Sequence, residues 1–306
     1  MGPIRKLARV NNSRHNPILA FACRSSIGRA TFPYMQSQTD LGAGLGKKIM
    51  RTLDHNSGCH IDIDGAKIYY EITGGENDPV LLFLHGGFGS LEDANSFLTQ
   101  LEGSFRIIGI DSQGQGASTL GRQNLSYERL QKNVEQIMAR LDIDELSVIG
   151  FSDGGIVGYR LASLSGLKIK KLVTIGSRWS YKNAEATKDI LGRVTAERWR
   201  KKFPDTYEKY CKLNPEPDFD RLVPSIIRMW LDSDSSGYPN EAVKNITCPL
   251  LIVRGDDDHL VPREFVFELS ELVKNSTLLN IPFAGHAAYL DQEKIFNLIV
   301  NRFLQG

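Results

Sequence analysis

Residues 146–164 read Leu-Ser-Val-Ile-Gly-Phe-Ser-Asp-Gly-Gly-Ile-Val-Gly-Tyr-Arg-Leu-Ala-Ser-Leu, and this stretch decides the fold class. Its first four residues predict a short buried strand, and residues 154–164 predict a helix. Between them, Gly150-Phe-Ser152-Asp-Gly154 matches G-x-S-x-G, in which a serine stands on a sharp turn from strand to helix. Glycines are needed there because neighbouring Cβ atoms would clash with the strand and the helix. We predict that Ser152 is a nucleophile, and a serine that caps an ordinary helix is the alternative.

An acidic cluster and a histidine follow two later apolar runs. Asp256–Asp258 come after Leu250–Val253, and His286 comes after Thr277–Ile281. The carboxyl ends of parallel strands meet at one edge of a sheet, so these groups can reach Ser152. Serine is a weak nucleophile, which needs a base near neutrality and a carboxylate that orients that base. The residues alone do not choose among the three aspartates.

The rest of the chain alternates between strand and helix patterns. Strand character runs from Ile61 to Ile72, and further apolar runs predict strands at 80–84, 105–110 and 172–175. Helical spacing marks residues 130–141 and 292–303. This alternation predicts an α/β fold with a mostly parallel central sheet wrapped by helices.

One interval interrupts the alternation. Residues 177–248 show helical patterning without a good strand, and they contain all three tryptophans, Trp179, Trp199 and Trp230. We therefore predict an inserted helical lid at 179–245, within a core made of residues 60–178 and 246–306. The tryptophans could pack the lid or line an apolar pocket for an acyl group.

The N-terminal residues 1–59 predict a basic, disordered arm. Up to Arg51 the chain has nine basic residues and one acidic residue, whereas the remainder has 28 basic and 35 acidic ones. The arm could be a transit peptide, which would place the protein in an organelle, or a basic tail for an anionic surface. It could also be a non-native extension, since Cys23–Ala30 looks like translation through a transfer-RNA gene. We favour this last interpretation, with Met50 as the natural start.

Composition excludes several classes of protein. The 306 residues carry 37 basic and 36 acidic side chains, so nothing global indicates a nucleic-acid partner. No apolar stretch approaches the ~20 residues that a membrane span needs. Four cysteines without a CxxC pair argue against a zinc ribbon or a disulfide scaffold. A reducing compartment, the cytoplasm, is therefore the default location, and the oligomeric state cannot be inferred.

Over roughly residues 60–304 the chain resembles the α/β-hydrolase fold superfamily. The motifs that carry the resemblance are His85-Gly-Gly-Phe-Gly-Ser90, Asp111-Ser-Gln-Gly-Gln-Gly-Ala-Ser118, the turn at Ser152, Gly255-Asp-Asp-Asp258 and Gly285-His286. The resemblance implies that Ser152 is the nucleophile, Asp258 the acid and His286 the base. It implies neither a metal nor an organic cofactor.

The same resemblance implies an oxyanion hole made of two backbone N–H groups. One belongs to Asp153, and the other to Gly87, with Phe88 as the neighbouring candidate. Asp153 also brings a carboxylate near the pocket, which could repel anionic substrates, attract a cationic amine or simply face solvent. Gln113 departs from the family, whose members often have arginine at that position.

We expect a serine hydrolase that cleaves a small-molecule carboxylic ester through an acyl-serine intermediate. The resemblance leaves an aminopeptidase, a lactonase or a carbon–carbon bond hydrolase as alternatives within enzymes, because the fold does not fix the substrate. A non-enzymatic protein that binds a ligand or regulates a partner with the same pocket is the alternative from another class. Within the site, His85 is expected to brace a loop, Asp256 to hold the turn and His259 to lie in the turn or face solvent.

Overall fold

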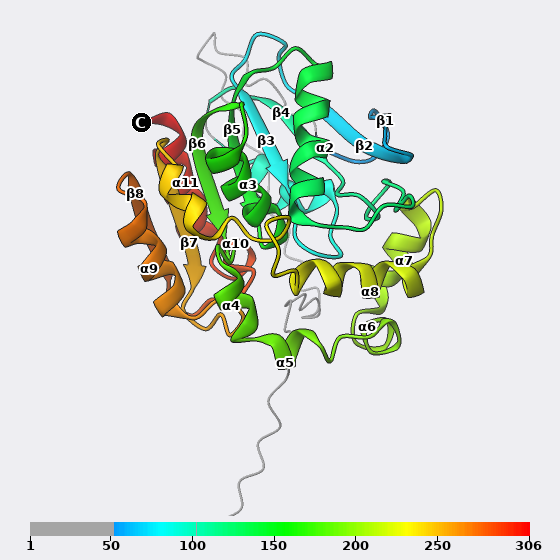
Figure 1. Cartoon of the computed structure of the whole chain (residues 1–306). Coiled ribbons are helices and arrows are strands. Elements are labelled where there is room, and N and C mark those ends of the chain that lie inside the picture. The colour runs from blue at the N-terminus through cyan, green and yellow to red at the C-terminus, as the bar shows by residue number, and fades with distance from the viewer. Residues whose placement is uncertain (1–51, 102) are drawn as a thin grey trace, which may run out of the picture.

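The central element of the fold is a sheet of eight strands in the order β1-β2-β4-β3-β5-β6-β7-β8 (Figure 1). This computed structural model describes residues 52–101 and 103–306. The strands are β1 (Cys59–Ile63), β2 (Ala66–Thr73), β3 (Val80–Leu84), β4 (Arg106–Ile110), β5 (Glu145–Phe151), β6 (Lys168–Ile175), β7 (Leu250–Gly255) and β8 (Ser276–Ile281). Pairing from β4 through β8 is parallel, whereas β2 pairs antiparallel with both β1 and β4. The predicted mostly parallel sheet is confirmed.

The stretch from Ile61 to Ile72 forms two strands rather than one. β1 and β2 pair antiparallel around the two-residue turn Asp64–Gly65, where both residues have positive φ angles of 51° and 79°. Asp-Gly favours such a tight hairpin because glycine adopts positive φ without steric cost. The alternation on either side of the turn hides this break in the sequence.

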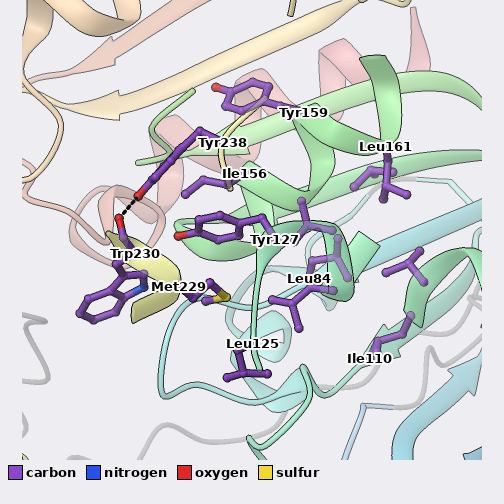
Figure 2. Close-up of a cluster of buried hydrophobic side chains, with 14 of the residues drawn as sticks. Leu84, Ile110, Leu125, Tyr127, Ile156, Tyr159, Leu161, Met229, Trp230 and Tyr238 are labelled. Carbon is purple, nitrogen blue, oxygen red and sulfur yellow. Dashed lines mark hydrogen bonds between the residues drawn. The ribbon is translucent and has the colours of Figure 1, made fainter. Parts of the chain in front are cut away.

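Helices cover both faces of the sheet. They are α1 (Asn95–Leu98), α2 (Tyr127–Arg140), α3 (Asp153–Leu164), α9 (Arg263–Leu272), α10 (Ala288–Asp291) and α11 (Glu293–Gln305), with a short 3-10 helix η1 (Leu91–Ala94). Successive side chains of a strand point to opposite faces. Leu82 and Leu84 of β3 therefore join the core under α2 and α3, part of which Figure 2 shows, whereas Leu81 and Phe83 join the core under α1, α10 and α11.

Between β6 and β7 the chain forms a run of helices. They are α4 (Tyr181–Glu185), α5 (Lys188–Leu191), α6 (Ala196–Lys202), α7 (Pro204–Leu213), α8 (Phe219–Trp230) and the 3-10 helix η2 (Asn240–Asn245). In Figure 1 the arrowheads of the parallel strands point toward α4–α8. The apolar face of α8, with Val223, Ile226 and Met229, is buried in the same core as α2 and α3. These helices therefore lie over the sheet edge where the predicted site residues are expected.

Residues 1–51 of the predicted arm lie outside the described residues, but its last part is packed. Leu53 is fully buried, and its backbone exchanges two hydrogen bonds with the Asn95 side chain at 3.0 and 2.7 Å. The packed part of the chain therefore extends at least to Leu53. Across the described residues, no helix has the length and apolar character that crossing a membrane requires.

Candidate active site

Ser152 stands on the turn between β5 and α3, with φ 50° and ψ −113°. A positive φ is unusual for a residue with a side chain and stores strain, a pattern that is common at active sites. Three glycines allow the turn, because a Cβ on Gly150, Gly154 or Gly155 would overlap neighbouring atoms of the turn, of β3 or of Ser177. The Ser152 side chain makes no helix-capping hydrogen bond, so the alternative of a capping serine is wrong.

The structure brings the three predicted site residues together. His286 Nε2 lies 3.0 Å from Ser152 Oγ, and His286 Nδ1 lies 2.9 Å from Asp258 Oδ2. Asp258 and His286 are 2% and 3% exposed, so the contact between them is buried, whereas the contact with the partly exposed Ser152 is half-buried. The neutral histidine that donates from Nδ1 to the carboxylate keeps the Nε2 lone pair toward the serine hydroxyl.

Asp258 is held as a carboxylate. Its Oδ1 accepts hydrogen bonds from the backbone N–H groups of Leu260 and Val261 at 2.8 and 3.2 Å. Burial alone would raise the pKa of Asp258, but the charge and hydrogen bond of His286 and these N–H groups lower it below its ordinary value. The acid therefore stays ionised beside the histidine near neutral pH.

The other two aspartates of the cluster point elsewhere. Asp256 Oδ1 accepts hydrogen bonds from Arg263 Nε at 2.6 Å and from Asn280 Nδ2 at 2.8 Å, so it holds the turn. Asp257 is exposed. Of the three aspartates, Asp258 is the one that lies within hydrogen-bonding distance of His286.

The predicted oxyanion groups lie at the first turn of α3 and on the loop after β3. Asp153 is the first residue of α3, a position whose N–H has no partner within a helix. A Cβ on Gly86 would come within 3.2 Å of Ser152 Cβ, so this loop passes directly beside the serine. The N–H of Phe88 donates to Gln115 Oε1 at 2.5 Å. Phe88 is therefore occupied, and Gly87 is the better candidate on this loop.

The Asp153 side chain is buried, so the alternative of a solvent-facing carboxylate is wrong. It is 4% exposed, and Trp230 Nε1 lies 2.9 Å from each of its oxygens, while the Tyr127 hydroxyl donates to Oδ1 at 2.8 Å. Burial raises the pKa of Asp153, although both of these hydrogen bonds act to lower it. Figure 2 shows Trp230 beside Tyr238, whose hydroxyl donates to the Trp230 carbonyl at 2.9 Å.

His85 braces a loop, as predicted. Its Nδ1 donates to the Gly86 carbonyl at 2.7 Å, and its Nε2 accepts from the Ser112 N–H at 2.9 Å. His259 is exposed and lies in the turn after Asp258. Gln113 bridges the Leu120 carbonyl and the Asn133 amide at 2.8 and 3.0 Å.

Two neighbouring cavities lie at this site, and only the smaller one is lined by Ser152. The larger, of about 530 Å³, runs between the loop after β3, the helices α6–α8 and α10. The smaller, of about 20 Å³, is lined by Ser152 and His286 and shares Gly87 and Trp199 with the larger one. Trp199 and Trp230 therefore line cavities, whereas Trp179 is buried and donates from Nε1 to the Phe265 carbonyl at 2.8 Å. No group of three or more potential metal ligands occurs within the described ranges.

Sequence reasoning missed Arg178, which lines the smaller cavity together with Ser152. The available signal was its position, three residues beyond the carboxyl end of β6, at the sheet edge where Asp258 and His286 were expected. It also missed the contact between Asp153 and Trp230, because 77 residues separate the two in sequence.

Comparisons with known proteins indicate a hydrolase fold. A family model described as alpha/beta hydrolase fold matches residues 79–228. Serine hydrolase BPHL of Mus musculus is 27% identical over 259 residues, covering 80% of this chain and 85% of that protein. The bifunctional esterase/perhydrolase DCH of Acinetobacter calcoaceticus is 26% identical, covering 79% and 98%.

Solved structures have the same fold. The esterase EaEST from Exiguobacterium antarcticum superposes with a TM-score of 0.67 at 20% identity, covering 81% of this chain and all of that one. The meta-cleavage product hydrolase CumD from Pseudomonas fluorescens superposes with a TM-score of 0.64 at 22% identity, covering 81% and 98%. At such identities the likeness concerns the fold alone.

Proposed function

We propose that this chain, which belongs to the α/β-hydrolase fold superfamily and whose relatives named above are hydrolases, is a serine hydrolase of small-molecule carboxylic esters. The observation that carries the proposal is the unbroken chain of contacts from Ser152 Oγ through the His286 ring to Asp258, at 3.0 and 2.9 Å. A strained serine, a buried base and an ionised acid at one sheet edge are the parts that acyl transfer needs.

Acylation begins when the Ser152 hydroxyl attacks the ester carbonyl carbon. His286 Nε2 takes the hydroxyl proton as the bond between Oγ and carbon forms, and Asp258 stabilises the imidazolium. The carbonyl oxygen becomes an oxyanion that accepts hydrogen bonds from the N–H groups of Gly87 and Asp153. Each such donor typically contributes about 3 kcal/mol of barrier lowering. The intermediate collapses as the bond to the leaving oxygen breaks and His286 protonates the departing alcohol.

Deacylation repeats these steps with water. His286 takes a proton from a water molecule as that water attacks the acyl carbon, and the second tetrahedral intermediate releases the acid. The proton returns from His286 to Ser152 Oγ, which restores the starting state. No electron transfer is involved, and every proton that leaves one group is received by another.

The cavities favour a small organic substrate. A volume of about 530 Å³ falls in the range of small-molecule sites, and its lining includes the aromatic side chains Phe88, Trp199 and Phe219. We propose that the helices α6–α8 act as the lid over this cavity, since Trp199, Tyr210 and Leu222 line it from their side. Aminopeptidase, lactonase and carbon–carbon bond hydrolase activities use the same Ser152 chemistry and remain alternatives for the bond that is cleaved.

The test is turnover of p-nitrophenyl acetate, butyrate and octanoate by the full-length protein, beside Ser152→Ala. We expect turnover that the variant loses by at least about 10⁴-fold, and labelling by a fluorophosphonate probe at Ser152. Thermal unfolding of the variant serves as the control for folding. A folded wild-type protein that neither turns over any ester nor reacts with the probe would contradict the proposal and favour a ligand-binding protein.

A further inference from the structure

Arg178 is a charged residue of this site that has no role in the proposed mechanism. It lies beyond β6, is 8% exposed, and lines the smaller cavity with Ser152 and His286. Its Nε donates to the Leu260 carbonyl at 3.2 Å, whereas its Nη2 is buried without a hydrogen-bond partner. The cavity thus contains a buried cation with an unused donor next to the serine.

The other buried arginines of the described chain are satisfied. Arg160, 4% exposed, donates from Nε to Gln131 and from Nη1 to two backbone carbonyls at 2.8–2.9 Å. Arg254, also 4% exposed, uses all three of its nitrogens as donors. Natural proteins pair nearly all buried donors, because an unpaired one loses its hydration without compensation. The unpaired nitrogen of Arg178 therefore calls for an acceptor that is not part of the chain.

The nearby acids do not supply that acceptor. No ion pair within 4.0 Å joins Arg178 to any carboxylate in residues 52–101 and 103–306. Asp153 is occupied by Trp230 and Tyr127, and Asp258 by His286 and two backbone N–H groups. Arg178 acts on Asp153 by Coulomb attraction, which lowers the pKa of that carboxyl.

A second donor of the same cavity is also unpaired. Trp199 lines the cavity, is 5% exposed, and its Nε1 has no hydrogen-bond partner. The backbone leading to Arg178 is held against the base, because a Cβ on Gly176 would lie 3.1 Å from His286 Nδ1. Two residues that line the space beside Ser152 thus each have a buried donor without a hydrogen-bond partner, and one of the two residues is charged. Such a donor set matches an anionic oxygen ligand.

We infer that Arg178 binds a carboxylate of the substrate, so that the natural substrate is an ester that carries a free carboxylate. This inference rests on the proposed function and names its substrate class. A cavity of about 20 Å³ holds little more than a water molecule, so the carboxylate enters as the Trp199 indole, which lines both cavities, shifts. Asp153 also lines this cavity, and its carboxylate accepts hydrogen bonds from Trp230 and Tyr127, so the preference measured below decides whether Arg178 outweighs the repulsion expected from Asp153.

The test compares two esters that differ in one charge. p-Nitrophenyl hydrogen glutarate carries a carboxylate, and p-nitrophenyl glutaramate carries a neutral amide of nearly the same shape. Spontaneous hydrolysis is measured without protein and subtracted. We expect wild-type kcat/KM to favour the carboxylate by at least about 10-fold, and Arg178→Met to bring that ratio close to one, mainly by raising KM for the carboxylate ester.

Two further variants separate recognition from folding. Arg178→Lys keeps the charge but not the planar fork, and we expect it to retain part of the preference. Arg160→Met removes a buried arginine that does not line either cavity, and we expect it to alter both esters equally. If Arg178→Met does not fold, the wild-type ratio and the Arg178→Lys ratio still decide. A wild-type ratio near one, or equal losses on both esters in Arg178→Met, would overturn the inference.

Failure of the proposed function can be distinguished from failure of this inference. It would appear as a folded wild-type protein without turnover of any ester and without fluorophosphonate labelling. Calorimetric binding of glutarate to wild-type and Arg178→Met protein then tests the carboxylate site by itself. Binding that the variant loses supports the site, and binding of equal strength in both proteins, or no binding at millimolar glutarate, contradicts it.

Discussion

Two histidines of this molecule make similar hydrogen bonds but differ in the protonation state that those hydrogen bonds favour. His286 lies between a carboxylate, Asp258, and a hydroxyl, Ser152, at 2.9 and 3.0 Å. His55 lies between two carboxylates, Glu92 and Asp111, at 2.6 and 2.7 Å. A histidine between two acceptors must donate from both ring nitrogens, which only the imidazolium can do. A histidine beside one acceptor and one hydroxyl keeps a lone pair that can take a proton.

The environment of His55 follows from this difference. Burial alone would lower the pKa of His55, but the hydrogen bonds and charges of Asp111 and Glu92 outweigh it and raise the pKa above its ordinary value. Asp111 also accepts from the N–H groups of Leu91 and Ala117 at 2.8 and 2.7 Å. His55 is thus a charged tie between the residues before β1, η1 and the loop after β4, whereas His286 Nε2 lies beside the Ser152 hydroxyl.

The largest expected difference comes from replacing each histidine with glutamine. His286→Gln removes the base, and we expect kcat on p-nitrophenyl butyrate to fall about 10⁴- to 10⁶-fold with little change in Tm. His55→Gln removes a structural tie, so we expect a lower Tm and a kcat within about threefold of wild type. Steady-state kinetics and thermal unfolding of both variants check this. Comparable losses of kcat in the two variants would remove the distinction between base and tie.

The two acids should separate in the same way. In Asp258→Asn the amide cannot hold the reactive tautomer of His286, and we expect kcat to fall about 10³- to 10⁴-fold in a protein that still folds. Asp111→Asn leaves His55 and two backbone N–H groups facing a poorer acceptor, so we expect a loss of stability instead. Urea unfolding and kinetics of both variants are the measurements. An Asp258→Asn enzyme with near wild-type kcat would exclude Asp258 as the acid.

The sequence singled out His286 and gave no sign of the contacts of His55, and the reason is physical. Ser152, Asp258 and His286 each follow a strand, and parallel strands bring their carboxyl ends to one edge, so local patterns sufficed. His55 precedes the first strand in a stretch without periodicity, and its partners Glu92 and Asp111 lie 37 and 56 residues away. Nothing local in the sequence marks such a contact.

Two other features of the structure were also not visible in the local sequence. The hairpin of β1 and β2 looked like one strand because alternation continues across Asp64–Gly65. The burial of Asp153 depends on Trp230, which arrives from the far end of α8. Strand-end motifs could therefore be predicted, whereas hydrogen bonds that cross from the helical insertion to the sheet edge could not.

Gly87→Ala tests the oxyanion loop beside the reactive histidine. An added Cβ would lie 2.8 Å from Asp153 Oδ2 and 2.9 Å from Trp230 Cζ2, so the loop or these two side chains beside Ser152 must shift. We expect kcat to fall about 10²-fold, because one misplaced donor costs about 3 kcal/mol. Labelling by a fluorophosphonate should slow in parallel. Gly166→Ala, at an exposed position where an added Cβ meets no atom within 4 Å, is the matched control, and an unchanged kcat in Gly87→Ala would exclude this loop as a donor.

The pH dependence of stability should show whether His55 is protonated in the folded protein. Its pKa is higher in the folded state than in the unfolded chain, so its contribution is fully present below the unfolded value of about 6.5 and is lost as pH rises through the folded value. We expect wild type to exceed His55→Gln by about 1–3 kcal/mol at pH 5.5, and by less at pH 9. Urea unfolding across this range is the measurement. A difference that stays constant or grows with pH would contradict a protonated His55.

The smallest effect is expected for Lys209, which connects the Glu92 carboxylate bound by His55 to the helical insertion. Lys209 Nζ of α7 lies 3.1 Å from Glu92 Oε2, the acid that also accepts from His55, and the two side chains are 39% and 31% exposed. Solvent screens such a pair, so Lys209→Ala should cost no more than about 1 kcal/mol, and the cost should shrink in 0.5 M salt. The loss in His55→Gln should persist in that salt, because its side chain is only 6% exposed. Urea unfolding at both salt concentrations measures the two. Equal salt sensitivity would mean that His55, too, acts as a surface charge rather than as a buried tie.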